Sequence, residues 1–286
     1  MKVAVELCAA TLAVSLHHLC GLPPLTGFMG GKRRWAAELA DAAFGRGRLD
    51  QVIAVDAGPW GDVWMTLTNS AQRARVVARL RELDERGTLK DLWPELVAEA
   101  PSDDPARRVA QYLCVQARVT NSLPVWWEPA QSAGMFVMPT KTYETAPWRA
   151  AAAQHSSAAR GGGMTRVATL AERIERIPPD VYARLHVVHG KVQDVQPIPG
   201  AVVLFDPPYR GAPRYAEVLP REEVLDVARA WSKVAARVVV CEGEPLPLDG
   251  WQTYRLAAKE WVTAWGLPHA PGAQLNLIAP RFAGDK

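Results

Sequence analysis

The sequence lacks the closely spaced cysteines that would indicate a zinc site or a small disulfide scaffold. Its 286 residues contain four cysteines, and none of them lies near another in the chain. They are Cys8, Cys20, Cys114 and Cys241. We therefore predict reduced thiols, as in a cytoplasmic protein, and no metal site.

Long hydrophobic runs are also missing. The apolar stretch at residues 3–16 is too short and too interrupted to span a membrane, because Glu6 lies within it and His17 and His18 follow it. The same interruptions argue against an export signal. We expect residues 3–16 to form an N-terminal helix packed on the domain, and we expect no membrane partner.

An excess of one charge is absent as well. Lys and Arg number 33 against 30 Asp and Glu, which gives a formal charge of +3. Contact with a nucleic acid must therefore come from a local concentration of basic side chains. The hydrophobic fraction of 49% is ordinary for a soluble protein with a substantial core. One large α/β domain with a smaller inserted subdomain fits this length.

Helix and strand patterns alternate along the chain. Short apolar runs predict strands at residues 51–55, 185–188, 201–205 and 237–241. Apolar residues at helical spacing predict helices at 33–44, 71–86, 105–120, 167–177 and 221–235. This alternation predicts βαβ units and a mostly parallel sheet, with strands at 251–256 and 274–279 as an antiparallel pair at its end.

Residues 121–164 have a different character, with Trp126, Trp127 and Trp148 interspersed among Pro, Gly and basic residues. Tryptophans bury a large area, so packing within a subdomain is favoured over stacking on nucleic-acid bases. Glycines and basic residues in the second part of this segment could order on a phosphate backbone. A solvated surface loop is the alternative.

Asp206-Pro207-Pro208-Tyr209 follows the predicted strand at 201–205. Catalytic groups of open α/β sheets gather at the carboxyl ends of the strands. The two prolines fix backbone torsions and remove amide donors, so the carbonyl groups here serve as acceptors. Together with the Asp206 carboxylate and the Tyr209 ring, these groups suit the binding of a planar amine. The alternative is a plain turn, because Asp and Pro are common turn formers.

The chain resembles the Dam-type family of DNA adenine-N6 methyltransferases, which carry Asp-Pro-Pro-Tyr as their catalytic motif. Residues 28–32 (FMGGK) resemble the family's aromatic-x-Gly-Gly-Lys motif, and residues 135–139 resemble its Phe-x-x-Pro segment. Residues 274–278 are similar to its last strand. The resemblance covers about residues 25 to 280 in order.

The family's cofactor loop reads acid-Pro-Phe-x-Gly-x-Gly. Residues 55–61 (VDAGPWG) take its place here, with Trp60 and Asp62 where the two glycines align. Asp56 could instead cap a helix, and the glycine pair at 30–31 could be a plain loop. The resemblance implies a catalytic set of Asp206, Pro207, Pro208 and Tyr209, and a cofactor set of Phe28, Gly30, Gly31, Lys32, Asp56, Gly58, Asn69 and Gly190.

The resemblance leads to the following expectation for the whole protein. It is an S-adenosyl-L-methionine-dependent enzyme with a Rossmann-like methyltransferase fold, acting on a flipped-out adenine of double-stranded DNA as a monomer. An RNA adenine methyltransferase and an inactive DNA-binding relative remain alternatives.

The expected parts are a cofactor half at 1–70, a largely helical target-recognition subdomain at 71–180 and a catalytic half at 181–286. The expected DNA contacts are Lys141, Arg149, Arg160 and Arg166. The target sequence, and the choice between a restriction, orphan or phage role, stay open.

Overall fold

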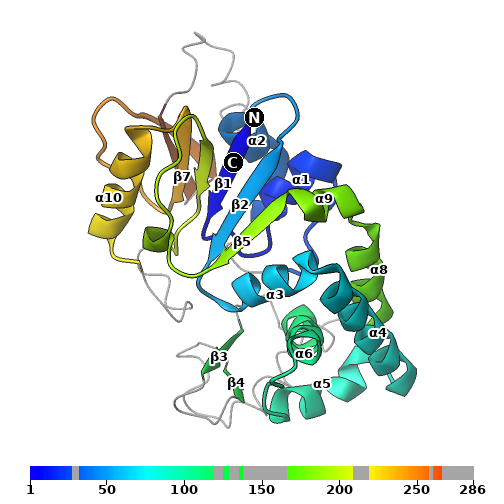
Figure 1. Cartoon of the computed structure of the whole chain (residues 1–286). Helices are drawn as coiled ribbons and strands as arrows, with labels where there is room; N and C mark the ends of the chain where they lie inside the picture. Colours follow the sequence, from blue (N-terminus) through cyan, green and yellow to red (C-terminus); the bar gives the residue numbers. More distant parts are fainter. Residues whose placement is uncertain are drawn as a thin grey trace, which may run out of the picture.

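The computed structural model describes residues 1–27, 32–118, 125–128, 135–137, 166–208, 219–257 and 260–265. A seven-stranded sheet lies at its centre, which confirms the α/β class (Figure 1). The strands are β1 Val3–Leu7, β2 Gln51–Asp56, β5 Leu185–His189, β6 Val202–Phe205, β7 Arg237–Glu242, β8 Gln252–Ala257 and β9 Glu260–Trp265.

The spatial order of these strands is β5-β2-β1-β6-β7-β9-β8. The first five are parallel, whereas β9 runs antiparallel to both β7 and β8. Strands β3 (Trp126–Glu128) and β4 (Met135–Val137) belong to a separate sheet. If the seven strands of the central sheet are counted in chain order, their spatial order is 3-2-1-4-5-7-6. The chain first builds outward from β1 to one side and then restarts on the other side at β6. The boundary between β1 and β6 is thus the topological switch point, where open α/β sheets bind ligands.

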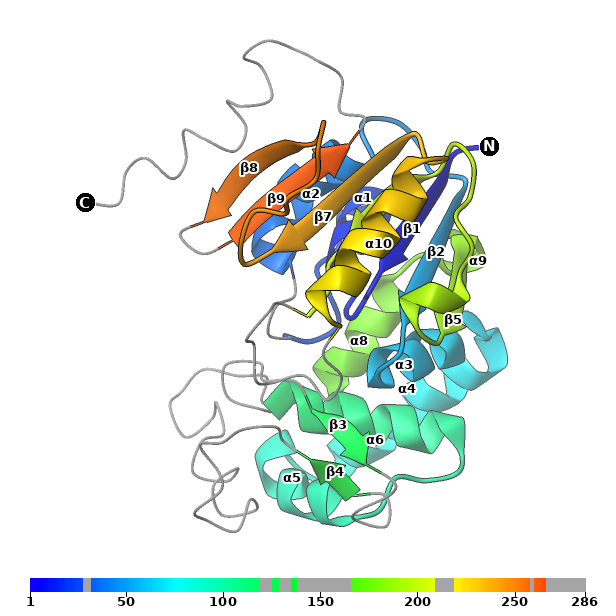
Figure 2. The same cartoon turned by 90° about the vertical axis from the view of Figure 1, so that its left-hand side faces the viewer.

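The central strands are apolar because helices cover both faces of the sheet. All five residues of β1 and all four of β6 are buried. Val5 and Val203 pack in one core cluster with Trp231 of helix α10 (Arg221–Ser232), and Ala4 packs in the cluster on the other face. Figure 2 shows α10 on one side of the sheet and α1 and α2 on the other.

The helix predicted at residues 3–16 is wrong. These residues form β1, a loop and the start of α1 (Ala13–Cys20). A short run that is apolar on both faces cannot be assigned to a buried helix or a buried strand by periodicity alone. The helix predicted at 33–44 is confirmed as a short 3-10 helix, η1 (Lys32–Trp35), that continues into α2 (Ala36–Ala43).

A largely helical segment lies in the chain between helix α3 (Pro59–Thr68), which follows β2, and strand β5, and it is called the insertion below. Its helices α5 and α6 and its hairpin lie beyond the carboxyl ends of the parallel strands (Figures 1 and 2). One hydrophobic cluster runs without a break from the sheet into α4, α6 and α8. The elements are α4 Ser70–Arg86, α5 Leu89–Ala98, α6 Pro105–Arg118, β3 Trp126–Glu128, β4 Met135–Val137, α8 Ala168–Arg176 and α9 Pro179–Arg184.

The other predicted elements can be compared with this structure. The helices at 71–86, 105–120, 167–177 and 221–235 are confirmed with small shifts at their ends, and α5 was not predicted. The strand predicted at 251–256 is confirmed as β8, but its antiparallel partner among the described residues is β9, which was not predicted. The strand predicted at 274–279 lies outside the described residues. Within the described part of the chain, no helix has the length and apolarity needed to cross a membrane. All four cysteines are described, and none of them is joined to another in a disulfide.

Candidate functional site

Five parallel strands end at one edge of the sheet, and polar side chains gather there. The switch point between β1 and β6 lies at the middle of this edge. The polar residues at or next to the strand ends are Glu6, Asp56, His189, Asp206 and Glu242.

Asp206 lies directly at the switch point. Its backbone N–H donates to the Leu7 carbonyl at 3.1 Å, so the chain after β6 stays attached to the end of β1. Its carboxylate Oδ1 lies 2.8 Å from the Lys32 Nζ. Pro207 is buried and Pro208 is half-buried. The predicted catalytic motif therefore holds its carboxylate in a fixed position, as far as residue 208.

Lys32 belongs to the predicted cofactor set, yet its ammonium contacts the predicted catalytic carboxylate. The lysine side chain is 4% exposed and the Asp206 side chain 17%. Lys32 opens η1, which packs against α1 on the side of the sheet opposite α10. A buried ammonium needs an anionic partner because its desolvation is costly. The two predicted sets thus meet in a single ion pair.

Asp56 holds two loops together. Its Oδ2 accepts the Ala10 N–H at 2.8 Å, and its Oδ1 accepts the Gly58 N–H at 2.8 Å. Burial raises the pKa of this carboxyl, and these backbone amides oppose the rise. Gly58 is the N-cap residue of α3, so Asp56 supports the start of that helix and the loop after β1 together.

The loop after β1 has an unusual backbone. Cys8, Ala10 and Leu12 adopt positive φ angles of 59°, 39° and 52°, a region that glycine enters far more easily. The shape is held by packing and hydrogen bonds: Leu12 is fully buried, and the Trp64 indole N–H donates to the Ala10 carbonyl at 2.8 Å. Three left-handed residues so close together indicate a turn whose shape is constrained.

This loop is the feature that the sequence analysis missed. The family's loop has an acidic residue followed by glycines four and six positions later. Glu6, Ala10 and Leu12 have that same spacing, and Ala10 and Leu12 have the backbone conformation that glycines would favour. Residues 55–61, chosen earlier for this role, follow β2 and not the strand at the switch point. The loop after β1 is therefore a second candidate for the family's cofactor loop, beside residues 55–61.

Glu6 is a buried carboxyl beneath this loop. It accepts hydrogen bonds from the Ser15 hydroxyl and, at 3.3 Å, from the Ser15 backbone N–H. Burial raises the pKa of Glu6 to about 8, Ser15 opposes the rise, and the charges of Asp206 and Asp56 add to it. The carboxyl groups of β1, β2 and the catalytic motif therefore influence one another electrostatically.

Two glycines allow backbone segments to approach closely at this edge. A Cβ on Gly61 would lie 2.4 Å from the Asp56 carbonyl oxygen and 2.7 Å from the His189 ring. Gly61 therefore lets α3 pack tightly on the ends of β2 and β5. Gly190 donates its N–H to the same Asp56 carbonyl at 3.1 Å. Gly58 and Gly190, both in the predicted cofactor set, thus lie at the edge with Asp56.

Asn69 is not brought to this edge. Its side chain caps α4 by accepting the Gln72 N–H at 3.0 Å. It follows α3, whose far end lies towards α9, since the Arg73 guanidinium bonds the Leu67 carbonyl and covers the Tyr182 ring at 4.0 Å. Helix α9 precedes β5 and so lies at the amino end of that strand.

The other predicted residues are only partly described. Arg166 is exposed, and its guanidinium lies 3.8 Å from the Asp84 carboxylate of α4. Seven predicted site residues lie outside the described residues. They are Phe28, Gly30, Gly31, Tyr209, Lys141, Arg149 and Arg160.

A buried amide connects the insertion to the segment before residues 28–32. The Gln116 side chain of α6 donates to the Gly27 carbonyl at 3.3 Å and accepts the Val125 N–H at 3.0 Å. Arg173 of α8 donates to the Leu25 carbonyl at 2.7 Å. Two helices of the insertion therefore fix the chain that leads towards Lys32.

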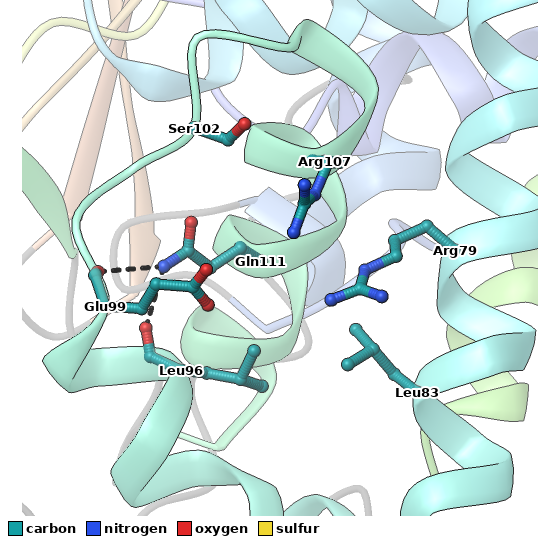
Figure 3. Close-up of a pocket in the computed structure, with 7 residues that line it drawn as sticks. All are labelled: Arg79, Leu83, Leu96, Glu99, Ser102, Arg107 and Gln111. Atoms are coloured by element: carbon teal, nitrogen blue, oxygen red, sulfur yellow. Dashed lines mark hydrogen bonds between the residues drawn. The ribbon is translucent and has the colours of Figure 1, made fainter.

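A separate hollow lies within the insertion, between α4, α5 and α6 (Figure 3). Arg79, Arg107 and Glu99 line it, and Gln111 closes one side by donating to the Leu96 and Glu99 carbonyls. Arg79 is paired with Glu82. The hollow contains none of the predicted site residues, so we do not include it in the candidate site.

The edge of the sheet offers a rigid carboxylate beside fixed backbone carbonyls, which can accept hydrogen bonds from an amine. Among the described residues, no three His, Cys, Asp or Glu side chains are grouped so as to hold a metal ion. A scan of protein-family models and a search of curated proteins gave no match to this chain.

Proposed function

We propose that the protein is an S-adenosyl-L-methionine-dependent methyltransferase that modifies the exocyclic amino group of adenine in double-stranded DNA. The observation that carries the proposal is the position of Asp206-Pro207-Pro208 at the switch point, directly after β6 and bonded to the end of β1. The five parallel strands have the order 3-2-1-4-5, which is that of Rossmann-like sheets with a ligand site at the switch point, and this supports the same assignment.

The residues around the switch point fit a positively charged cofactor. Glu6, Asp56 and Asp206 supply carboxyl groups, and the pKa of Glu6 is raised partly by the other two. A cation bound beside them would relieve this repulsion. The constrained loop after β1 and Asp56, which braces it, are the parts that would hold the cofactor. When bound, S-adenosyl-L-methionine supplies an electrophilic methyl group on a sulfonium.

The chain's own task is to orient the target amine. The adenine amino nitrogen is a weak nucleophile because its lone pair is delocalised into the ring. Hydrogen bonds donated to the Asp206 carboxylate and to the Pro207 carbonyl would make it more electron-rich and aim it at the methyl group. The amine would take the methyl group that the sulfonium gives up as a thioether, and the amine proton hydrogen-bonded to the Asp206 carboxylate would pass to solvent. Positioning for in-line attack provides much of the rate.

DNA recognition is assigned to the insertion. Its helices α5 and α6 and its hairpin lie beyond the carboxyl ends of the parallel strands, on the side where Asp206 follows β6 (Figures 1 and 2). Four arginines of α4 pair with carboxylates of the protein, so they are poor candidates for phosphate contacts. These arginines are Arg75, Arg79, Arg81 and Arg86. Lys141, Arg149, Arg160 and Arg166 remain the proposed phosphate contacts. Arg166 also lies near a carboxylate, but its 3.8 Å separation from Asp84 is longer than those of the α4 pairs, and its side chain is 69% exposed.

The test is direct methylation. Purified protein is incubated with isotope-labelled S-adenosyl-L-methionine and with double-stranded DNA, single-stranded DNA or RNA, and the nucleosides are analysed by mass spectrometry. We expect N6-methyladenine from double-stranded DNA, formed about 10²- to 10³-fold more slowly by an Asp206→Asn control. Product from RNA alone would favour the RNA enzyme. Cofactor binding without transfer to any substrate would favour an inactive relative, and no cofactor binding by calorimetry would overturn the proposal.

A further inference from the structure

Lys32 belongs to the predicted cofactor set, but it contacts a residue of the predicted catalytic set. The family's Gly-Gly-Lys segment is expected beside the cofactor. In the structure the Lys32 ammonium instead lies 2.8 Å from the Asp206 carboxylate. The lysine is 4% exposed, so the contact lies inside the protein and is not a surface pairing.

The surroundings of Asp206 explain why a cation is needed there. The titratable groups at this edge are Glu6 and Cys8 of β1 and its loop, Asp56 of β2, His189 of β5 and Glu242 of β7. Three of them are carboxyl groups on neighbouring strands. Asp206 contributes to the raised pKa values of both Glu6 and Cys8, so its charge acts on both groups. Because electrostatic interactions are mutual, a cation beside Asp206 offsets the unfavourable contacts between its charge and these groups.

Protonation of Asp206 would impair the proposed reaction. A neutral carboxyl group is a weaker acceptor than a carboxylate, and its proton competes with the target amine for the same oxygen atoms. An ammonium within hydrogen-bond distance favours the charged form and also fixes the orientation of the carboxylate. Lys32 is itself anchored, since it opens η1 against α1.

We propose that Lys32 is a positioning residue that keeps Asp206 charged and oriented to accept the target amine. It acts through Asp206 and not as a ligand of the cofactor. The inference rests on the proposed function and adds a role within the same site. A cofactor ligand would control cofactor affinity, whereas a positioning residue controls the rate of transfer and its dependence on pH.

The test separates these two outcomes with three variants. Lys32→Met keeps the length of the side chain and removes the charge, and Lys32→Arg keeps the charge. Lys233→Met is the matched control, because it removes an exposed lysine at the end of α10. Single-turnover methyl transfer is measured against pH, and the affinity for S-adenosyl-L-methionine is measured by calorimetry.

We expect Lys32→Met to slow single-turnover transfer about 10²-fold, the size of effect that misplacing a reacting group produces. Cofactor affinity should change less than about threefold, the context-dependent spread of such effects. The acidic limb of the pH profile should move about one to two units higher, as it would when a carboxylate loses a neighbouring cation. The acidic limb of the pH profile of Lys32→Arg should lie close to that of the wild type. Lys233→Met should behave as the wild type. Adding Asp206→Asn to Lys32→Met should cause less loss than the two single effects combined.

Other results would overturn the assignment. A tenfold weaker cofactor affinity with an unchanged rate and pH profile would make Lys32 a cofactor ligand. Equal behaviour of Lys32→Met and Lys233→Met would remove it from the site. If Lys32→Met does not fold, the pH profile of Lys32→Arg and its coupling to Asp206→Asn decide the question. Absence of transfer by the wild-type protein would overturn the proposed function itself.

Discussion

The carboxyl edge of the sheet and the helical insertion both contain ion pairs, but these pairs differ in their exposure to solvent. At the edge, Lys32 and Asp206 are 4% and 17% exposed. In the insertion, Arg81 and Glu175 are 61% and 42% exposed, although their contact of 2.7 Å is shorter. A short distance therefore does not rank these two ion pairs by the free energy that forming them involves. Burial does, because a buried pair carries a desolvation penalty that an exposed pair avoids.

An intermediate pair connects the two regions. Arg108 of α6 donates to both carboxylate oxygens of Asp62 in α3, at 2.7 and 3.0 Å, and both side chains are less than one fifth exposed. This two-point contact fixes α6 to the helix that follows β2. The insertion is therefore held to the sheet by a directed contact as well as by the shared hydrophobic core. We therefore expect substitutions at the edge of the sheet to have the largest effects on activity or stability, and substitutions of exposed residues in the insertion to have the smallest.

The largest effect is expected for Asp206. Asp206→Asn keeps the shape of the side chain but removes its charge, so methyl transfer should fall about 10²- to 10³-fold, as when a preorganised electrostatic partner is lost. Cofactor binding should remain. Asn is the better test than Ala, because its side-chain oxygen can still accept a hydrogen bond from the buried Lys32 ammonium, whereas Ala removes the acceptor altogether. Single-turnover assays and calorimetry check this, and near-normal turnover would remove Asp206 from catalysis.

Gly61→Ala should mainly affect stability. The new Cβ would lie 2.4 Å from the Asp56 backbone oxygen, so α3 would have to move away from β2 and β5. Overpacking of this kind costs about 1 to 3 kcal/mol of unfolding free energy, and a backbone contact favours the upper end. Urea denaturation measures the loss. Gly47→Ala is a control for a glycine with nothing within 4 Å, although its own φ of 101° adds strain. Equal stability of wild type and Gly61→Ala would contradict the close packing.

Glu6 should make stability depend on pH. Its pKa is raised from 4.5 to about 8, so between these values the folded protein holds a proton that the unfolded chain releases. The stabilising contribution is complete below about pH 4.5 and is lost as pH rises to about 8. Relative to Glu6→Gln, the wild type should lose at most about 1.4 kcal/mol of unfolding free energy per pH unit in this window. Denaturation at pH 5, 6.5 and 8 tests this, and parallel curves would contradict it.

Much of the sheet could be predicted from local patterns. The strand before Asp206 is a short apolar run, and its position next to the Asp-Pro-Pro motif is visible in the sequence. The strand at residues 3–7 could not be separated from a helix, because it is apolar on both faces and is followed by more apolar residues. Because of that error, the loop after β1 was not considered as a candidate cofactor loop.

The pairing of Lys32 with Asp206 could not be predicted at all. It depends on how η1 packs against α1, and no local propensity encodes that arrangement.

Asn69 differs from Lys32, because its role is a local one that the sequence can indicate. Its position after a predicted strand and helix suggested a cofactor contact, but an Asn before a helix is also a common cap, and the structure shows the cap.

The smallest effect is expected for the exposed pair in the insertion. Arg81→Met should change the unfolding free energy by less than about 0.5 kcal/mol, because solvent and salt screen both partners and the long side chains lose entropy when they pair. Methyl transfer should not change. Arg108→Met is the matched comparison, since it removes the less exposed two-point contact with Asp62 and should cost clearly more. Urea denaturation of both variants at low and at high salt measures the difference. Equal losses for the two variants would show that burial does not rank these ion pairs, and the distinction between the edge of the sheet and the insertion would have to rest on chemistry alone.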